Sequence, residues 1–182
     1  MTSMNTLQYF LSDQIEIVNN AVAMAEELVS NAYKMSASQW LRRLYDVKTL
    51  TDLSADEIVH GPFAQIIRYK GQRKDTSLES SAYDFYKICL QDHSILEVTT
   101  EGSEIELFPF TLYIVSHELI HIVRFSQFLQ NFNASPEERM VEEQHVHSKA
   151  HTILKAVKIS GLATVLTFYE KWRTPVDEIR NP

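Results

Sequence analysis

Apolar residues recur every three or four positions near the start of the chain, and this spacing predicts one long amphipathic helix. The apolar stripe consists of Leu7, Leu11, Ile15, Val18, Val22, Ala25, Val29 and Ala32. Asp13 and Glu16 stand three residues apart near its beginning, which is a spacing typical of a helix start. We expect the stripe to cover the hydrophobic core of the protein.

Two shorter capped elements are predicted after this helix. Ser36 is followed three residues later by Gln39, and this pair can cap a helix that continues to Leu44. Ser54 and Glu57 have the same spacing and predict a single turn, which ends before the Gly-Pro pair at positions 61 and 62. Both elements are expected to pack against the core rather than to carry chemistry.

In the middle of the chain, short runs of β-branched and aromatic residues predict strands. One run occupies 63–69 between glycine and proline breaks, and further runs occupy 83–90 and 95–100. We therefore expect a small sheet ahead of the most apolar helix. A helix remains an alternative for residues 80–97, because serines at the start of that segment can cap one.

A His-Glu-x-x-His motif lies within the apolar run that ends before Arg124. At 3.6 residues per turn, His117 and His121 lie about 40° apart around the helix axis. Ile114 and Phe125 fall on the same side, so the two imidazoles are expected to point toward the core. Two histidines on one helix face can bind a single metal ion, and zinc is the metal that this motif suggests.

Glu118, the second residue of the motif, lies about 100° from His117 around the helix axis, so it is poorly placed to be a third ligand. It is well placed to accept a proton from water beside the metal. Zinc held by neutral imidazoles lowers the pKa of water toward roughly 7, and a neighbouring carboxylate can take that proton. The motif therefore predicts amide or ester hydrolysis with Glu118 as the general base.

A second helix is predicted to begin after Ser135. Ser135 is a suitable N-cap, Pro136 suits the first helical position, and the acidic residues that follow complement the helix dipole. The short connection implies that this helix runs antiparallel to the motif helix. We expect it to continue, with a bend near Gly161, as far as Pro175.

The third metal ligand is expected on this second helix, which carries two polar stripes. One stripe consists of Glu138, Glu142 and His145, and the other of Glu143, His147 and His151. Counting back from the turn places Glu142 opposite His121, so we choose Glu142 as the third ligand. The residues left open as alternative ligands, or as partners that orient a ligand, are Glu138, Glu143, His145 and His147.

Further residues are expected near the reacting groups. Candidates for stabilising negative charge on a reacting oxygen are Tyr113, Arg124, His147 and His151. Arg124 also lies about opposite Glu142, so a salt bridge between these two residues is the competing interpretation of Glu142. The segment before the motif can offer an edge strand, to which an extended peptide adds through main-chain hydrogen bonds.

The motif helix, the turn and a glutamate about twenty residues past the second histidine resemble the gluzincin group of zinc metallopeptidases, including the small minigluzincins. The resemblance covers residues 114–145. It implies a zincin-like α+β fold, in which N-terminal helices and a small central sheet precede the motif helix and an antiparallel C-terminal helix follows it. It also implies Zn²⁺ as the cofactor, with His117, His121 and Glu142 as ligands, Glu118 as the general base, and a peptide or small amide or ester as the substrate.

The same residues also form two Glu-x-x-His pairs, Glu118 with His121 and Glu142 with His145. Ferritin-like di-iron bundles combine such pairs with one glutamate from each of two further helices. Candidates for those glutamates are Glu16, Glu26, Glu27 and Glu170. Such a bundle requires an essentially all-helical chain, so the predicted strands favour the zincin-like fold. A third class, an interaction protein that keeps a zincin-like shape without activity, is also left open.

Length, charge and cysteine content narrow the setting. A chain of 182 residues that is 45% hydrophobic fits a single domain spanning 1–182. A net charge of −7 without a basic stripe argues against nucleic acid as a partner. Cys89 is the single cysteine, so no intrachain disulfide can form. Without a secretory signal or an apolar segment of bilayer length, the sequence favours a soluble cytoplasmic protein with no membrane partner.

Overall fold

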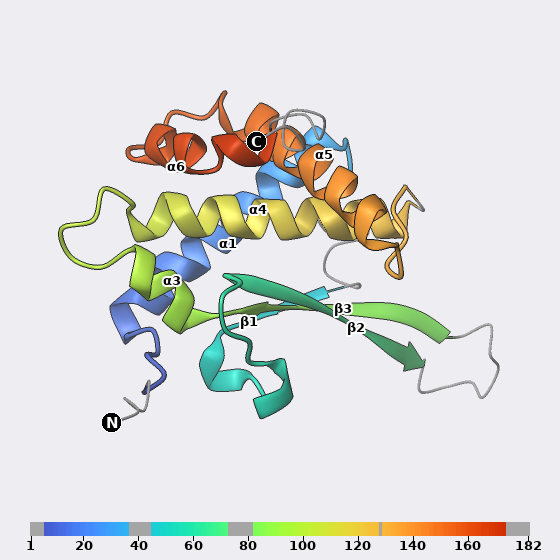
Figure 1. Cartoon of the computed structure of the whole chain (residues 1–182), viewed down its shortest axis with the longest axis horizontal. Coiled ribbons are helices and arrows are strands. Elements are labelled where there is room, and N and C mark those ends of the chain that lie inside the picture. Colours follow the sequence, from blue (N-terminus) through green and yellow to red (C-terminus); the bar gives the residue numbers. More distant parts are fainter. Residues whose placement is uncertain (1–5, 37–44, 73–81, 128, 174–182) are drawn as a thin grey trace.

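The fold is an α+β arrangement in which a layer of helices lies against a three-stranded sheet (Figure 1). The computed structural model describes residues 6–36, 45–72, 82–127 and 129–173. The helices are α1 (Ser12–Ala32), α3 (Asp92–Val98), α4 (Leu107–Ser126), α5 (Pro136–Leu154) and α6 (Leu162–Phe168). The strands are β1 (Tyr45–Lys48), β2 (Ala64–Gln72) and β3 (Ala82–Leu90). The α+β class expected from the sequence is therefore confirmed.

The sheet has the strand order β1-β3-β2, so β3 lies in its centre. β1 runs parallel to β3, with Tyr45 opposite Tyr86, and β2 runs antiparallel to it, with Ala64 opposite Leu90. The strands predicted at 63–69 and 83–90 are confirmed, whereas the sequence patterns do not predict β1. Within the described residues β2 pairs with β3 alone, which makes β2 an edge strand of this sheet.

The strand predicted at 95–100 is wrong, because the chain up to Val98 forms helix α3. The side chain of Asp92, the first residue of α3, is buried and accepts backbone N–H groups from Phe10 and Leu50, each at 2.9 Å. These long-range hydrogen bonds hold the start of the helix at a position that local residue preferences do not reveal. The helical alternative for 80–97 therefore holds only for the part that follows β3.

Helix α1 follows the predicted apolar stripe and packs against α4. Its buried residues are Val18, Ala21, Ala25, Val29 and Ser30. The helix begins at Ser12, where the Gln14 side chain accepts the backbone N–H of Leu11 at 2.8 Å. The start is thus set by Gln14 rather than by the spacing of Asp13 and Glu16.

The two shorter elements predicted after α1 have different outcomes. The turn predicted at Ser54 is confirmed as a 3₁₀ helix over Ala55–Glu57, with the Ser54 hydroxyl donating to Glu57 Oε1 at 2.8 Å. The short helix predicted to run as far as Leu44 falls on 37–44, which lies outside the described residues.

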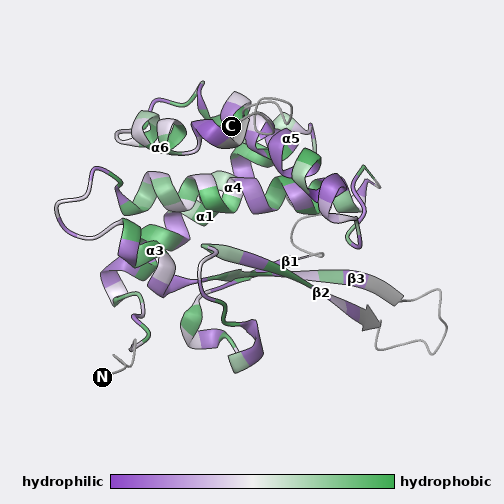
Figure 2. Cartoon of the chain, in the orientation of Figure 1, coloured by the Kyte–Doolittle hydropathy of each residue, from purple (hydrophilic) through white to green (hydrophobic). Residues whose placement is uncertain are grey.

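Helix α4 crosses the centre of the helical layer and contacts α1, α5 and the sheet (Figure 1). It is buried from Pro109 to Val123 except at Glu118, which is partly exposed. Figure 2 shows more hydrophobic colour along α4 and more hydrophilic colour along α5. Polar side chains inside a buried helix need partners, because an unpaired buried polar group is costly. The two motif histidines are such side chains.

Helix α5 begins as predicted and returns obliquely across α4 (Figure 1). The Ser135 hydroxyl accepts the backbone N–H of Glu138 at 3.2 Å, and Glu138 accepts the backbone N–H of Ser135 at 3.0 Å. The prediction that this helix continues with a bend is wrong, because α5 ends at Leu154 and a separate helix, α6, follows. Gly161 precedes α6 with φ of 80°, a left-handed conformation that interrupts a helix. The predicted stop at Pro175 lies outside the described residues.

Candidate metal centre

His117 and His121 lie one turn apart on α4 and point into the same space. Both side chains are buried, with residue exposures of 7% and 5%. Their Nε2 atoms are 3.1 Å apart. The two histidines therefore lie on one face of α4, as predicted.

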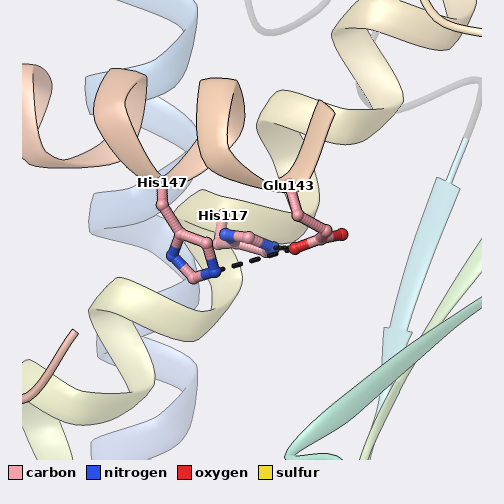
Figure 3. Close-up of side chains that lie close together, drawn as sticks. All are labelled: His117, Glu143 and His147. Atoms are coloured by element: carbon pink, nitrogen blue, oxygen red, sulfur yellow. Dashed lines mark ion pairs between the residues drawn. The ribbon is translucent and has the colours of Figure 1, made fainter. Parts of the chain in front are cut away.

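Glu143 of α5 brings a carboxylate to both imidazoles. Its Oε2 lies 3.1 Å from His117 Nε2, and its Oε1 lies 2.9 Å from His121 Nε2. The side chain is 45% exposed, so the carboxylate lies at the boundary between the buried histidines and solvent. Figure 3 shows Glu143 and His147 extending from the same helix toward His117.

The structure therefore brings Glu143, and not Glu142, to the two histidines. Glu142 forms an ion pair with Arg124, which is the competing interpretation of that residue. Neighbouring positions on a helix differ by about 100°, so the choice between adjacent glutamates depends on how α5 crosses α4. Residue spacing alone does not define that crossing. The other residues of the Glu142 stripe are also engaged elsewhere or exposed, since Glu138 caps α5 and His145 is exposed.

His147 is the fourth member of the cluster. It lies one turn after Glu143 on α5, with its Nε2 3.6 Å from Glu143 Oε2. Its ring centroid is 4.2 Å from that of His117. Ligand atoms of His117, Glu143 and His147 all lie within 4.8 Å of one another, so these three residues could hold a metal ion. The i,i+4 spacing of Glu143 and His147 is the sequence signal for this half of the cluster.

The second ring nitrogen of each histidine has a different environment. His121 Nδ1 lies 2.9 Å from Gln130 Oε1, and His147 Nδ1 lies 2.7 Å from the Tyr113 hydroxyl. His117 Nδ1 is buried without a hydrogen-bond partner among the described residues. No sequence signal identifies Gln130, which lies in the connection between α4 and α5. Tyr113 lies one turn before His117 on α4, and that spacing is its only sequence signal.

The charges of the cluster are strongly coupled in the metal-free chain. Burial disfavours a charged imidazole, but hydrogen bonding to Glu143 and the nearby Glu118 and Glu143 carboxylates raise the pKa of His121 to about 8. Burial alone would raise the pKa of Glu143, yet the hydrogen bonds from His117 and His121 hold it well below its usual range. An ionised Glu143 carboxylate and a protonated His121 imidazole therefore stabilise one another here.

Glu118 points to the space beside the cluster. Burial raises the pKa of its carboxyl group, while charge on His117 and His121 lowers it. A dication in the cluster would act in the same direction as those positive charges. Glu118 thus places a partly exposed carboxylate beside the donor atoms, which is the position that a general base requires.

Two cavities, of about 450 Å³ and 460 Å³, open beside the cluster. Ala64, Glu118 and Glu143 line both, so the cavities adjoin at these residues. The first is largely aromatic and includes Phe63, Tyr113, His117, His147, Phe168 and Tyr169. The second is more polar and includes Ile66, His121, Phe125, Gln130, Phe132 and Arg139. Ala64 begins the edge strand β2, and Ile66 of the same strand lines the second cavity, so the two cavities adjoin at the start of β2.

The glutamates required by the di-iron alternative lie apart from this cluster. Glu16, Glu27 and Glu170 are exposed, and Glu26 accepts a hydrogen bond from the Tyr45 hydroxyl. The sheet in the middle of the chain also departs from an all-helical bundle. Among the described residues, the arrangement therefore does not resemble the four-carboxylate core that the alternative needs.

Comparison of the chain with protein-family models, with curated proteins and with solved structures finds no match. The class of the protein accordingly rests on its own fold and site, an α+β domain with a His-Glu cluster able to hold a metal ion. No described helix combines the length and apolar character needed to span a membrane.

Proposed function

We propose that this protein is a zinc-dependent hydrolase whose metal is held by His117, His121 and Glu143. The observation that carries the proposal is the mutual approach of three donor groups, with separations of 2.9–3.1 Å between their nearest atoms. Ligand atoms about 2.1 Å from a tetrahedral zinc ion lie about 3.4 Å apart, so small side-chain adjustments suffice to bind it. Two imidazoles and one carboxylate are also a frequent ligand set of catalytic zinc.

Zinc bound by these residues supplies a Lewis acid and lowers the pKa of water toward about 7. Glu118 accepts a proton from the attacking water as the water oxygen forms a bond to the carbonyl carbon. When the carbon–nitrogen bond then breaks, the same carboxyl group returns the proton to the leaving amine. The sum of the steps is one water consumed for one amide cleaved, with Glu118 restored.

An extended peptide is the substrate class that the surroundings support best. The two cavities continue on either side of Glu118 and Glu143, which leaves room for chain on both sides of a scissile bond. β2 offers the backbone groups of an edge strand beside the second cavity. A peptide can add to such an edge through main-chain hydrogen bonds. We therefore favour a zincin-like metallopeptidase over an esterase.

The decisive experiment combines metal analysis with the Glu118→Gln variant. We expect about one zinc per chain after purification without chelators or a metal-affinity tag. Glu118→Gln should keep the zinc and lose cleavage of a quenched fluorescent peptide library, because the amide cannot accept the proton. Glu97→Gln, which changes an exposed glutamate on α3, is the matched control and should retain both properties. Undiminished cleavage by Glu118→Gln would reject Glu118 as the base.

A second candidate function is a non-catalytic zinc site that stabilises an interaction protein. The closeness of His147 to His117 and Glu143 favours it, because four protein ligands would close the site. Zinc binding without cleavage of any peptide by the wild-type chain would support this candidate. About two iron or manganese ions per chain would instead support the di-iron alternative.

A further inference from the structure

Two arginines near the connection between α4 and α5 have different surroundings. The guanidinium of Arg124 is paired with Glu142 and also donates to the Leu129 carbonyl at 3.4 Å. The exposed Arg139 side chain lines the second, more polar cavity beside the cluster, which we call the polar cavity. Among the residues that the structure describes, no group pairs with the guanidinium of Arg139. Arg124 is thus occupied within the fold, whereas Arg139 borders open space.

The carboxylates on α5 that could neutralise Arg139 are directed elsewhere. Side chains three and four positions apart on a helix are neighbours, so the natural partners of Arg139 are Glu142 and Glu143. Glu142 is paired with Arg124, and both oxygens of Glu143 are directed at the two histidines of α4. The helix therefore supplies a guanidinium without a counterion of its own, one turn from the carboxylate that faces the proposed metal.

The lining of the polar cavity is suited to a carboxylate. The planar guanidinium can donate two parallel N–H groups to the two oxygens of a carboxylate. The side-chain amides of Gln130 and Asn131 line the same cavity, and such amides contain further N–H donors. Phe125 and Phe132 contribute apolar surface, against which the methylene groups of a substrate can pack. The cavity thus combines a cation, polar donors and apolar walls.

The charges around the polar cavity favour an anion once a dication is bound. Glu118 and Glu143 border the cavity, and their carboxylates oppose an anion in the metal-free chain. A zinc ion on the proposed ligands carries enough positive charge to offset both carboxylates. Arg139 then remains as the uncompensated charge of the lining. A second guanidinium lies close by, since Arg68 of β2 has its Cζ 4.6 Å from the centroid of the Phe132 ring.

We propose that the polar cavity is a substrate subsite in which Arg139 binds a carboxylate of the peptide. This inference rests on the proposed hydrolase function and names the substrate class of that site, a peptide with a carboxylate close to the scissile bond. The carboxylate belongs to an acidic side chain or to the C-terminus of the peptide, since both present the same group to a guanidinium. Arg139 is thereby a specificity-determining residue and takes no part in the chemical steps.

The first test measures binding without cleavage. The zinc-loaded Glu118→Gln chain is titrated by calorimetry with short peptides that differ only in whether they carry a carboxylate. We expect the best carboxylate-bearing peptide to bind about tenfold more tightly than its neutral counterpart. Adding Arg139→Gln should remove this difference, and adding Arg139→Glu should reverse it. A preference that persists in the Arg139→Gln chain would mean that the metal or another group binds the carboxylate, and would overturn the proposal.

The design of the peptides separates the two sources of the carboxylate. One set is acetylated and amidated at its ends and carries glutamate or glutamine at each position in turn. The other set contains no acidic residue and ends in a free or an amidated C-terminus. A preference confined to the first set identifies an acidic side chain, and one confined to the second identifies the C-terminus. Equal binding throughout both sets would overturn the proposal.

Two further variants separate charge recognition from structural damage. Arg139→Lys keeps the charge but loses the planar pair of N–H groups, so it should retain only part of the preference. Lys155→Gln, which removes an exposed cation at the other end of α5, is the matched control and should retain all of it. Zinc affinity should stay within about threefold of wild type in both, as a chelator competition measures. A loss of the preference in Lys155→Gln would reduce the effect to net charge and overturn the role of Arg139.

Cleavage assays separate this inference from the proposed function. In the otherwise wild-type chain, Arg139→Gln should lower the ratio of kcat/KM between a carboxylate-bearing peptide and its neutral counterpart by about tenfold. Cleavage by the wild-type chain without any preference for a carboxylate would overturn this inference and leave the hydrolase proposal in place. Arg139-dependent binding of the carboxylate without cleavage of any peptide would instead reject the hydrolase and support the cavity as a peptide-binding site.

Discussion

Glu143 and Glu57 are two carboxylates that share one electrostatic property and differ in almost everything else. Glu143 has its pKa held well below the usual range, and hydrogen bonding from Lys87 and the Ser54 backbone lowers the pKa of Glu57 to about 2. The Glu57 side chain is 4% exposed, whereas that of Glu143 is 45% exposed. A lowered pKa is therefore common to both and does not by itself identify a site.

The partners of the two carboxylates explain the difference. Glu57 accepts from the Lys87 ammonium at 2.8 Å and from the Ser54 and Tyr69 hydroxyls, and these groups use its oxygens fully. An ammonium and hydroxyls at such a position stabilise the fold. Glu143 faces imidazoles, which can give up a proton and offer a lone pair to a metal, and it borders both cavities. A carboxylate is thus better identified as functional when its partners can exchange a proton for a metal ion and when it borders a cavity.

The largest effect is expected when the adjacent glutamates on α5 are replaced one at a time by alanine. Glu143→Ala should weaken zinc binding by more than about 100-fold, because it removes a proposed ligand. Glu142→Ala should weaken it by less than about threefold, since its carboxylate is paired with Arg124. Competition titration against a chromophoric chelator measures both affinities. A greater loss in Glu142→Ala would restore the ligand predicted from the sequence.

Removing the charge of Glu57 should change the stability of the fold and leave metal binding unchanged. Glu57→Gln should lower the free energy of unfolding by about 1–3 kcal/mol, because Lys87 loses a buried charged acceptor. Zinc affinity should not change. Urea unfolding measures the first quantity, and Glu97→Gln is the exposed control. A loss of zinc binding in Glu57→Gln would break the distinction between the two carboxylates.

The pH dependence of the Glu57 contribution has a defined sign. The pKa is lower in the folded chain, about 2, than the ordinary value of 4.5, so the contribution is present above pH 4.5 and is lost as pH falls toward 2. Stability curves of wild type and Glu57→Gln should accordingly converge over that interval. Parallel curves down to pH 2 would show that the carboxylate does not stabilise the fold through its charge.

The motif helix was predictable from the sequence, and the helix that faces it was predictable only in part. The buried face of His117 and His121 follows from the helical period and from apolar neighbours, both of which are local. Ser135 likewise defines the start of α5 locally. Which glutamate of α5 faces the histidines depends on the crossing of two helices, so Glu142 was chosen where the structure places Glu143.

Long-range hydrogen bonds account for the wrong strand at 95–100 and for the missed Gln130. The segment after Asp92 has the β-branched composition of a strand, but the Asp92 side chain binds the distant Phe10 and Leu50 backbone groups and begins a helix. Gln130 could not be assigned to the site from the sequence, because only the folded connection between α4 and α5 brings it to His121. Residue patterns indicate periodic elements well, whereas such contacts depend on the assembled fold.

In the metal-free chain, His121 should also contribute to stability in a pH-dependent way, with the opposite sign to Glu57. Its pKa of about 8 exceeds the ordinary value of 6.5, so its contribution to stability is fully present below pH 6.5 and is lost as pH rises through 8. We expect the contribution to be smaller than about 2 kcal/mol. Urea midpoints of the chelator-treated chain at pH 6 and pH 9 measure it. His121→Gln should remove this component, whereas the exposed His145→Gln should retain it.

The smallest expected effect concerns Gln130, which touches the proposed site without binding the metal. Gln130→Ala should weaken zinc binding by about tenfold, because His121 Nδ1 loses the acceptor that keeps its hydrogen away from Nε2. Gln130→Glu keeps an acceptor at the same distance along the side chain and should bind zinc at least as well as wild type. Chelator competition compares the three chains. Equal affinities for Gln130→Ala and wild type would mean that Gln130 does not orient His121 for the metal.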